Sequence, residues 1–537
     1  MTTEIFARKA SGLVREAGLF EMWTWNLWAT VPITFPIFVL PFLLMVLPGA
    51  NIPVALLFAI IANSLIGSIY AHFTAAMPRS GGEYVFLSRT IHPLIGLLMN
   101  WGMGSAFMVW YGYDFLFVAW MFNGFIGLFN PSVSAVLSQP VWTFIVGFII
   151  SLIALLIAIR GFRLVLKVMV GIATIGFIAI AATVAAFLAT GGIAGFMTMV
   201  NKWSAPYMPG IANPFQEIIN RAVQTGFTLP STVPINASHT LGLITVMSGT
   251  SIICVGFNSY IAGEMKKADS VKRQHIAMVG GNIAYLILGV ILLSSVLFAT
   301  GKDFAGASYY LSVNAPEQYP LPASLLYFPF SYLDVVAPRS APIFVLFGLF
   351  LISFLLQLMS PTALSRMFFA WAMDRHIPVG VTRVSEKYKT PYVAMILAFI
   401  GGMIMSIIFL LVPTIWAYIA FTFLFTITNM LVLAIAGIIF PYLRKDMYKA
   451  MPTKIEVGGV PLMSIISALG LIAMISLLTT FAIYPETFTY FGAASWDVVA
   501  VYIGVYLAPV IVHFLSRMYW KRQGIDIMMA FKEVPPA

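Results

Sequence analysis

One carboxylate, Asp114, lies inside a long apolar segment of this sequence. The other charged residues can be assigned to the ends of such segments or to the polar connections between them. A carboxylate within a membrane costs several kcal/mol unless it faces water or a partner. We therefore expect Asp114 to line a pathway, where it would contact a cationic group of a substrate or take up a proton. The alternative is a solvated wall residue of an outer vestibule. Tyr111, three residues earlier, would face the same side of a helix.

Two apolar segments contain residues that interrupt a helix. Residues 28–36 read WATVPITFP, in which Pro32 and Pro36 each remove a backbone donor. Residues 248–259 read SGTSIICVGFNS and combine glycines with hydroxyls in mid-segment. Spanning helices are normally continuous because their backbone groups must be satisfied internally. Paired breaks at corresponding positions of two halves indicate a transporter site, where half-helix N-termini hold a carboxylate and unwound carbonyls hold a cation. Ordinary kinks and small-residue packing are the alternative.

Other reactive residue types are sparse. Cys254 is the only cysteine, so an internal disulfide is excluded, and we interpret it as a small pocket-wall residue. His72 and His513 are interpreted as packing or interfacial histidines. The sequence has no phosphate-binding glycine loop, no metal-ligand spacing and no Ser/His/Asp constellation. These features predict a protein that is not an enzyme and has no cofactor or metal other than a coupling ion, Na⁺ or H⁺.

The composition sets the environment of these residues. Of 537 residues, 61% are hydrophobic and only 9% are charged. A soluble protein has about 25% charged residues, so a soluble enzyme is excluded. The net charge of +10 would raise the question of nucleic acid in a soluble protein. In a membrane protein it first concerns which side of the bilayer the charges occupy.

Each spanning helix needs about 20 apolar residues, and the sequence has room for twelve. The runs are too long and too uniformly apolar for barrel strands. We therefore predict an all-α polytopic membrane protein with an overlong, tilted third span. The twelve predicted spans are 20–47, 53–77, 93–127, 140–160, 164–190, 241–263, 275–300, 341–372, 390–412, 414–440, 459–483 and 495–516.

The basic residues test this topology. With the N-terminus inside and the spans alternating, 25 of the 29 Lys and Arg residues fall on the inner side. The four on the outer side are Lys202, Arg221, Lys302 and Arg339. The positive-inside rule therefore predicts a multi-pass cell-membrane protein with a cytoplasmic N-terminus (1–19) and tail (517–537). No removable signal peptide is expected. The long outer segments 191–240 and 301–340 would be either short helices over a vestibule or plain loops.

Three further motifs resemble those of the amino acid–polyamine–organocation (APC) family. Residues 77–89, MPRSGGEYVFLSR, are similar to the P-x-S-G-G-x-Y motif after helix 2 of that family. Residues 365–378, SRMFFAWAMDRHIP, resemble its signature after helix 8, and residues 387–391, KYKTP, its entry to helix 9. Gly256 with Glu264 follows the layout of helix 6, and Arg160-Gly161 that of the loop before helix 5. The resemblance covers roughly residues 10–445.

Some positions depart from the family pattern. Pro32-Ile33-Thr34 stands where a G-S-G-like triplet is usual, and Asp374-Arg375-His376 where Arg-Asp-Gly is expected. Some proton-coupled relatives have a lysine inside helix 5. The aligned position in this sequence lies near Gly176, where there is no lysine. These departures indicate a divergent branch and argue against a helix 5 lysine as proton carrier. Glu264, near Lys266 and Lys267, is expected to form an inner-gate or loop salt bridge.

The resemblance implies a LeuT-like fold of two inverted five-helix repeats with two peripheral helices. The first repeat would span 20–190 and the second 241–440, separated by the extracellular loop 191–240, with helices 11 and 12 and their connecting loop in 441–516. The substrate would lie between the breaks of helices 1 and 6, with side chains of helix 3 beside it. The implied substrate-binding residues are Ala29, Thr30, Val31, Pro32, Ile33, Thr34, Tyr111, Asp114, Ser251, Ile252, Cys254, Val255, Gly256 and Phe257.

Helix 8 carries a second implied site. In relatives of this fold its hydroxyls face helix 1, where a sodium ion can bind, so Ser360 and Thr362 would join the carbonyl of Val31 in a cation-coupling site. Hydroxyl–backbone bonds around Pro361 are an adequate structural explanation of the same residues.

The expected function is secondary active transport of amino acids across the lipid bilayer by alternating access, with no nucleic acid partner. A polyamine or organic-cation transporter or exchanger on the same fold is the nearest alternative. A nutrient sensor or channel on this scaffold, or a membrane-embedded enzyme, is the alternative of another class.

Overall fold

The computed structural model describes residues 12–321, 333–336, 340–412, 419–483 and 496–532. Within them, eleven helices are long and apolar enough to cross a membrane. Their edges lie within six residues of the predicted spans, and the largest difference is at the end of α22, which reaches Arg522 instead of 516. These helices are α3 (Ile52–Ala76), α5 (Pro93–Gly127), α7 (Pro140–Ile159), α8 (Phe162–Leu188), α11 (Ala237–Ile252) continued by η3 (Phe257–Glu264), α12 (Val271–Thr300), α16 (Ser340–Met373), α17 (Tyr392–Leu411), α18 (Ile419–Leu443), α20 (Leu462–Ile483) and α22 (Trp496–Arg522).

The segment predicted as the first span is divided. It consists of α1 (Leu19–Trp28), the π-helical η1 (Phe35–Val39) and α2 (Leu40–Met45). Residues 29–33, between α1 and η1, are not helical, and neither part alone is long enough to cross a bilayer. This interruption is the reason that eleven candidate spans are found where twelve segments were predicted.

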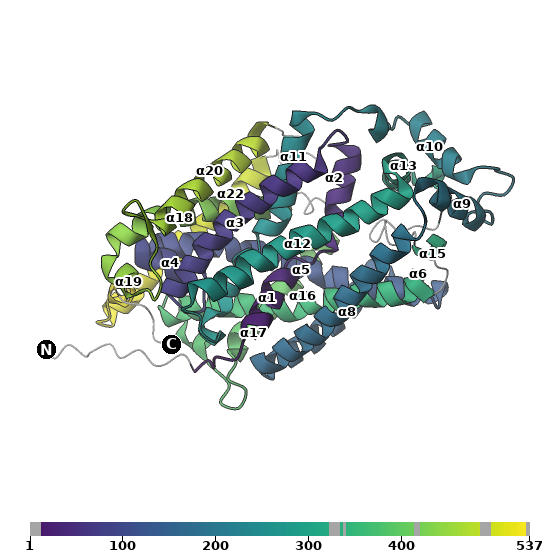
Figure 1. Cartoon of the computed structure of the whole chain (residues 1–537). Coiled ribbons are helices and arrows are strands. Elements are labelled where there is room, and N and C mark those ends of the chain that lie inside the picture. Colours follow the sequence, from purple (N-terminus) through teal and green to yellow (C-terminus); the bar gives the residue numbers. More distant parts are fainter. Residues whose placement is uncertain (1–11, 322–332, 337–339, 413–418, 484–495, 533–537) are drawn as a thin grey trace.

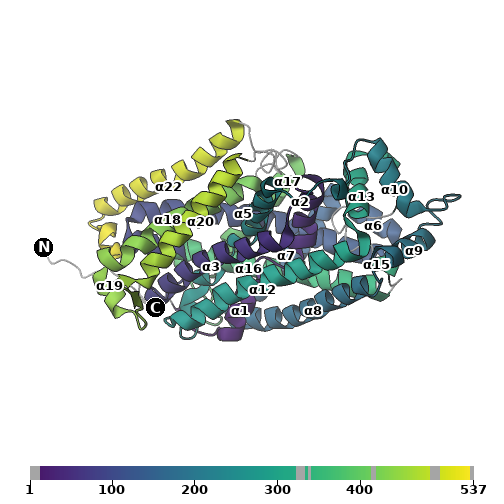
Figure 2. The same ribbon diagram turned by 45° about the horizontal axis from the view of Figure 1, so that its top comes forward.

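The long helices run side by side along the length of an elongated bundle (Figures 1 and 2). The short helices α9 (Ile193–Trp203), α10 (Pro214–Gln224) and α13 (Lys302–Asn314) gather at one end. The opposite end carries α4 (Glu83–Thr90) and α19 (Lys445–Ala450). The two long segments left open by the sequence thus contain short helices. Residues 322–332 and 337–339, including Arg339, lie outside the described residues.

The central helix of the bundle is α5, which is 35 residues long. At about 1.5 Å per residue it is longer than the hydrocarbon core of a bilayer, which is about 30 Å. It packs against α16, α17, α18, α4 and α7, so it contacts helices from both halves of the chain. A side chain on α5 can therefore be brought to the interface between those halves.

Both described ends of the chain pack on the end of the bundle that holds α4. Ala17 pairs with Met265, directly after η3, and Gly263 N donates to Ser80 Oγ just before α4. At the C-terminal end, the Arg89 guanidinium of α4 lies over the Phe531 ring. We call this the α4 end.

The remaining elements are short. A β-hairpin of β1 (Glu456–Val457) and β2 (Val460–Pro461) was not predicted. Its turn is Gly458-Gly459, with φ of 58° and 79°, conformations that favour glycine. The others are α6 (Pro131–Leu137), η2 (Pro230–Thr232), η4 (Pro316–Gln318), α15 (Leu333–Val336), η6 (Val379–Thr382) and η8 (Ile527–Phe531).

Candidate functional site

The break in the first span is held in a strained conformation. Val31 has a φ of 55°, which is unfavourable for a β-branched residue by about 1–2 kcal/mol. The carbonyl of Val31 accepts from the backbone N–H of Thr34 at 3.0 Å and from its hydroxyl at 2.9 Å. Because the Thr34 hydroxyl has one proton, its 2.8 Å contact with Tyr285 is donated by the tyrosine. Tyr285 on α12 thus helps to fix the unwound segment.

The break in α11–η3 is a tight turn. The N–H groups of Cys254 and Phe257 donate to Ser251 O at 3.3 Å and to Cys254 O at 3.0 Å, a three-residue spacing rather than the four of an α-helix. Gly256 is required by packing, because a Cβ atom there would lie 2.3 Å from the ring of Tyr70 on α3. The helix therefore ends at Ile252 and resumes as a 3₁₀-helix at Phe257.

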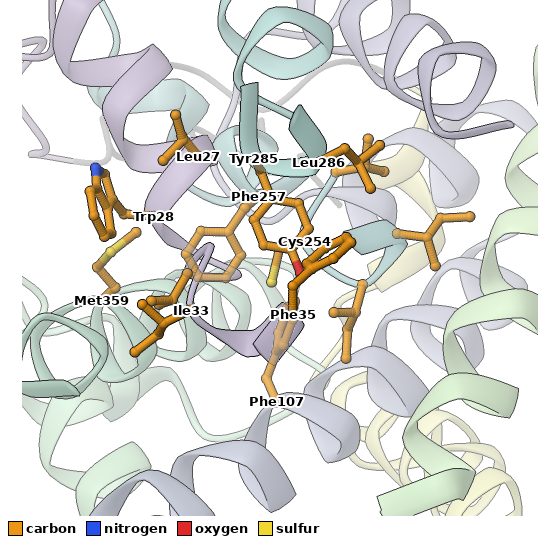
Figure 3. Packing of buried hydrophobic residues seen from close by; sticks show 14 of the residues in the cluster. Leu27, Trp28, Ile33, Phe35, Phe107, Cys254, Phe257, Tyr285, Leu286 and Met359 are labelled. Atoms are coloured by element: carbon orange, nitrogen blue, oxygen red, sulfur yellow. The ribbon is translucent and has the colours of Figure 1, made fainter. Parts of the chain in front are cut away.

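The two breaks lie in contact. The Cys254 thiol donates to the carbonyl oxygen of Ala29 at 3.5 Å. Figure 3 shows side chains of both segments, Ile33 and Phe35 from the first and Cys254 and Phe257 from the second, gathered with Tyr285 in one cluster. The two segments therefore lie side by side, and their role as a shared binding site stays a prediction.

The breaks leave main-chain donors free. Within the described residues, the N–H groups of Thr30, Val31, Ile33 and Gly256 make no hydrogen bond. Buried backbone groups are almost always paired, so a run of free donors at the contact between two helix ends is a ready site for an anion such as a carboxylate.

Asp114 lies inside the protein rather than in a vestibule wall. It is 6% exposed, and its Oδ2 accepts from Ser360 Oγ of α16 at 3.2 Å. Tyr111 is fully buried on the same helix, and its hydroxyl has no hydrogen-bond partner among the described residues. On the same helix, the ring centroid of Phe107 lies 5.5 Å from that of Phe257, so α5 packs beside the break in α11–η3.

The two hydroxyls of α16 differ in their contacts. Ser360 donates to Asp114, whereas Thr362 is fully buried and donates to Leu358 O at 2.7 Å. The Thr362 contact is the backbone bond that explains a hydroxyl beside Pro361 without an ion. Among the described residues, no group of three or more His, Cys, Asp and Glu side chains could hold a metal ion.

Exposure separates the predicted site residues into two groups. Ala29, Thr34 and Ser360 are half-buried, and all the others are buried. Ala29 and Thr34 flank the first break, and Ser360 is the hydrogen-bond partner of Asp114. The accessible surface of the candidate site is therefore concentrated at the first break and the facing part of α16.

Three polar residues were missed by the sequence analysis. Asn63 on α3 donates to Ser251 Oγ at 2.8 Å, and Asn282 on α12 donates to Ser251 O at 3.3 Å. Tyr285, on α12, donates to the hydroxyl of Thr34 at 2.8 Å. An amide inside an apolar span is itself a signal of interhelical bonding, and both asparagines could have been found in this way.

The α4 end is closed by buried ion pairs. The salt bridge expected at Glu264 is present, but its partner is Arg366 of α16, in a two-pronged contact of 2.8 Å at each oxygen, rather than Lys266 or Lys267. Arg89 of α4 pairs with Asp374 at 2.7 Å. All four side chains are at most 2% exposed. His376 lies beside them and contacts Tyr84 and His513, both at 2.9 Å.

A family model described as amino acid permease matches residues 25–525 of the chain. No curated protein matches the chain. The matched range includes both breaks, Asp114 and the ion pairs of the α4 end.

Proposed function

The chain belongs to the amino acid permease family, a family of membrane transporters, and on that premise we propose that it moves amino acids across the membrane by alternating access, driven by a cation gradient. Membership confirms the resemblance that the sequence motifs indicated. A transporter of this family has a small-molecule substrate and works in a lipid bilayer. The proposal concerns the substrate, the coupling ion and the mechanism.

The observation that supports it most is the contact between the two breaks. The 3.5 Å distance from Cys254 Sγ to Ala29 O joins the ends of interrupted helices that are far apart in sequence. Interrupted spanning helices that meet inside a bundle are the arrangement in which transporters bind solutes. The free N–H groups of Thr30, Val31, Ile33 and Gly256 would hold the carboxylate of an amino acid.

Asp114 would bind the cationic part of the substrate, opposite its carboxylate. In this proposal, its carboxylate attracts the ammonium group or a cationic side chain, and Ser360 orients it through the 3.2 Å hydrogen bond. A cation that enters would compensate the cost of a carboxylate buried with a neutral partner.

The same residues offer two routes for ion coupling. In the first, a sodium ion would bind the carbonyl of Val31 and the hydroxyls of Ser360 and Thr362. The hydroxyl of Thr362 already donates to Leu358 O, but its oxygen retains lone pairs for a cation. In the second, Asp114 would take up a proton.

We also propose the LeuT-like arrangement of two inverted five-helix repeats, with α20 and α22 peripheral and both termini cytoplasmic. The interruptions in the first span and in α11–η3 fall at the first helix of each proposed repeat. The excess of basic residues on the predicted inner side supports this orientation.

A polyamine or other organic cation is the alternative substrate, favoured by the burial of Asp114 at 6% exposure with no ion pair to a cation among the described residues. A polyamine lacks a carboxylate, so it would leave the free N–H groups of the breaks unused. The amino acid proposal uses both features of the site.

Flux into proteoliposomes tests the proposal. The purified full-length protein would be supplied with a panel of labelled amino acids and amines, under a proton or a sodium gradient imposed separately. We expect accumulation of at least one amino acid under one gradient. Accumulation of amines alone would favour the alternative substrate, and no accumulation of any compound would contradict the transporter proposal.

A further inference from the structure

A buried carboxylate outside the candidate substrate site has no cationic partner. Glu83 begins α4 and is fully buried. Its neighbours at the α4 end, Glu264 and Asp374, are buried as well, but each is paired with an arginine. Among the described residues, no Lys, Arg or His side chain forms an ion pair with Glu83. Ionised, it would be a buried charge without a counter-ion, which is costly.

The groups that face Glu83 are neutral and come from three elements. Its Oε1 contacts the hydroxyls of Tyr70 on α3 and Tyr260 on η3, the latter at 2.7 Å. Its Oε2 accepts from Asn100 Nδ2 of α5 at 3.0 Å. The orientation of Asn100 is fixed because its Oδ1 accepts from Trp371 Nε1 of α16 at 2.8 Å. Asn100 therefore donates to Glu83 in either protonation state.

The tyrosines allow Glu83 to be neutral. A protonated Glu83 would donate to the oxygen of Tyr70, whose own proton would then turn toward Asn429 of α18, which lies beside it. The side-chain atoms of Asn429 have no other hydrogen-bond partner among the described residues. Burial raises the pKa of Glu83, against the opposing effect of the donors Tyr70, Tyr260, its own backbone N–H and Asn100.

Glu83 also lies where two elements must separate if this end of the protein opens. The 80–83 turn is bonded to η3, because the N–H groups of Gly81 and Gly82 donate to Tyr260 O and Ser259 O, both at 3.3 Å. Gly263 N donates back to Ser80 Oγ at 3.1 Å. Movement of η3 away from this turn would remove Tyr260 from Glu83 and admit water to the carboxyl group.

We propose that Glu83 is a proton-binding site, and that loss of its proton accompanies the separation of η3 from the 80–83 turn. The proton-binding part stands on the structure of the α4 end alone, and the opening rests on the proposed alternating access. The pH dependence of the closed state follows from the two environments of Glu83. The closed state favours the neutral carboxyl group, whereas the open, hydrated state favours the carboxylate. Low pH therefore stabilises the closed state, and this stabilisation is lost as the pH rises through the raised pKa of Glu83.

Infrared difference spectroscopy tests proton binding directly. The purified full-length protein would be titrated without substrate, and the carbonyl band of protonated carboxyl groups would be compared between the wild type and Glu83→Gln. We expect a protonated carboxyl group that persists above the usual titration range of a glutamate, is missing in Glu83→Gln and remains in the control Glu217→Gln. Tyr260→Phe removes a donor that favours the carboxylate, so it should move the transition to higher pH. A carboxyl band that is the same in the wild type and Glu83→Gln would overturn the proposal.

Hydrogen exchange tests the coupled movement. After correction for the intrinsic pH dependence of exchange, the amides of η3 should exchange faster in the wild type as pH rises. Glu83→Gln, which mimics the neutral group, should remain slow, and α17 should show no such dependence in either protein. An identical pH dependence of η3 in both proteins would overturn the coupling. Both measurements are made without substrate, so they remain informative whatever the flux experiment shows.

Discussion

At the scale of single residues, the polar groups that matter are those whose surroundings do not fully satisfy them. Asp114 has one neutral partner, Ser360, and the amides of Thr30 and Val31 have none among the described residues. Val31 is also kept in a conformation that its side chain disfavours. Unsatisfied groups and backbone strain persist only where the surrounding structure imposes them, and they concentrate at functional sites.

Asp114→Asn separates charge from shape. Asparagine keeps an acceptor for Ser360 but loses the negative charge, so we expect uptake of cationic substrates to fall at least about tenfold, equivalent to ~1.4 kcal/mol. Initial uptake rates of the transported compounds measure this effect. Asp446→Asn is the control, because the Asp446 side chain is 72% exposed and should leave the rates unchanged. Unchanged uptake, selectivity and pH dependence in Asp114→Asn would remove this residue from the site.

Gly256→Ala tests the packing of the second break. The new Cβ would lie 2.3 Å from the buried Tyr70 ring, so the ring or the turn must move, at a cost of about 1–3 kcal/mol. We expect a lower unfolding temperature and loss of uptake. Gly171→Ala in α8 is the matched control, since nothing lies within 4 Å of its Cβ, and alanine there should be neutral or stabilising by about 1 kcal/mol. Equal effects of the two substitutions would contradict the packing argument.

At the scale of elements, the α4 end is held together by contacts between segments distant in sequence. Glu264 at the end of η3 binds Arg366 in α16, and Arg89 of α4 binds Asp374 after the same helix. These pairs connect the second half of the broken span to the helices around it. Opening of this end requires that at least the η3 contacts be exchanged for water.

Glu264→Gln leaves the Arg366 guanidinium buried without its carboxylate. We expect it to destabilise the protein by about 3–5 kcal/mol, measured as the change in unfolding free energy in detergent. Combining Glu264→Leu with Arg366→Met should restore most of the loss. The half-buried pair of Glu217 and Arg221 in α10, whose side chains are 34% and 30% exposed, is the control, and Glu217→Gln should cost less than about 1 kcal/mol. A similar loss of unfolding free energy in both variants would show that the buried pair does not stabilise the α4 end.

Helix positions could be predicted from the sequence because each span is a local pattern of apolar residues. The predicted third span, 93–127, has the bounds of α5, and the breaks near Pro32 and Gly256 are local signals too. Pairings could not be predicted, because they depend on packing between distant segments. Arg366 is 102 residues from Glu264, whereas Lys266 and Lys267 are close in sequence but do not pair with it. The proposed proton site at Glu83 could not be predicted, because the motif that contains Glu83 does not indicate that its side chain is buried.

At the scale of the whole molecule, the proposed function requires the two ends of the bundle to face opposite sides of the membrane. The chain has one cysteine, Cys254, and it is buried. Single cysteines can therefore be introduced as reporters at exposed positions without replacing it. Lys202 in α9 and Lys521 in α22 are both exposed, and they lie on opposite sides in the predicted topology.

Labelling with a membrane-impermeant maleimide tests this orientation in intact cells. We expect Lys202→Cys to react from outside, and Lys521→Cys to react only after the membrane is permeabilised. The wild type should remain unlabelled in intact cells because Cys254 is buried. The reverse pattern would mean that the basic residues do not mark the inner side and that the α4 end faces outward.

If the chain works as proposed, its substrate binds where the breaks of the first span and of α11–η3 meet. The most direct measurement is the rate at which a small permeant alkylating reagent modifies Cys254, followed by mass spectrometry, with and without a saturating transported substrate. The thiol lies 3.5 Å from Ala29 O, so a substrate bound there should slow its modification, while the thiol introduced by the Lys202→Cys substitution should react at an unchanged rate. A Cys254 alkylation rate that the transported substrate does not change would contradict the account.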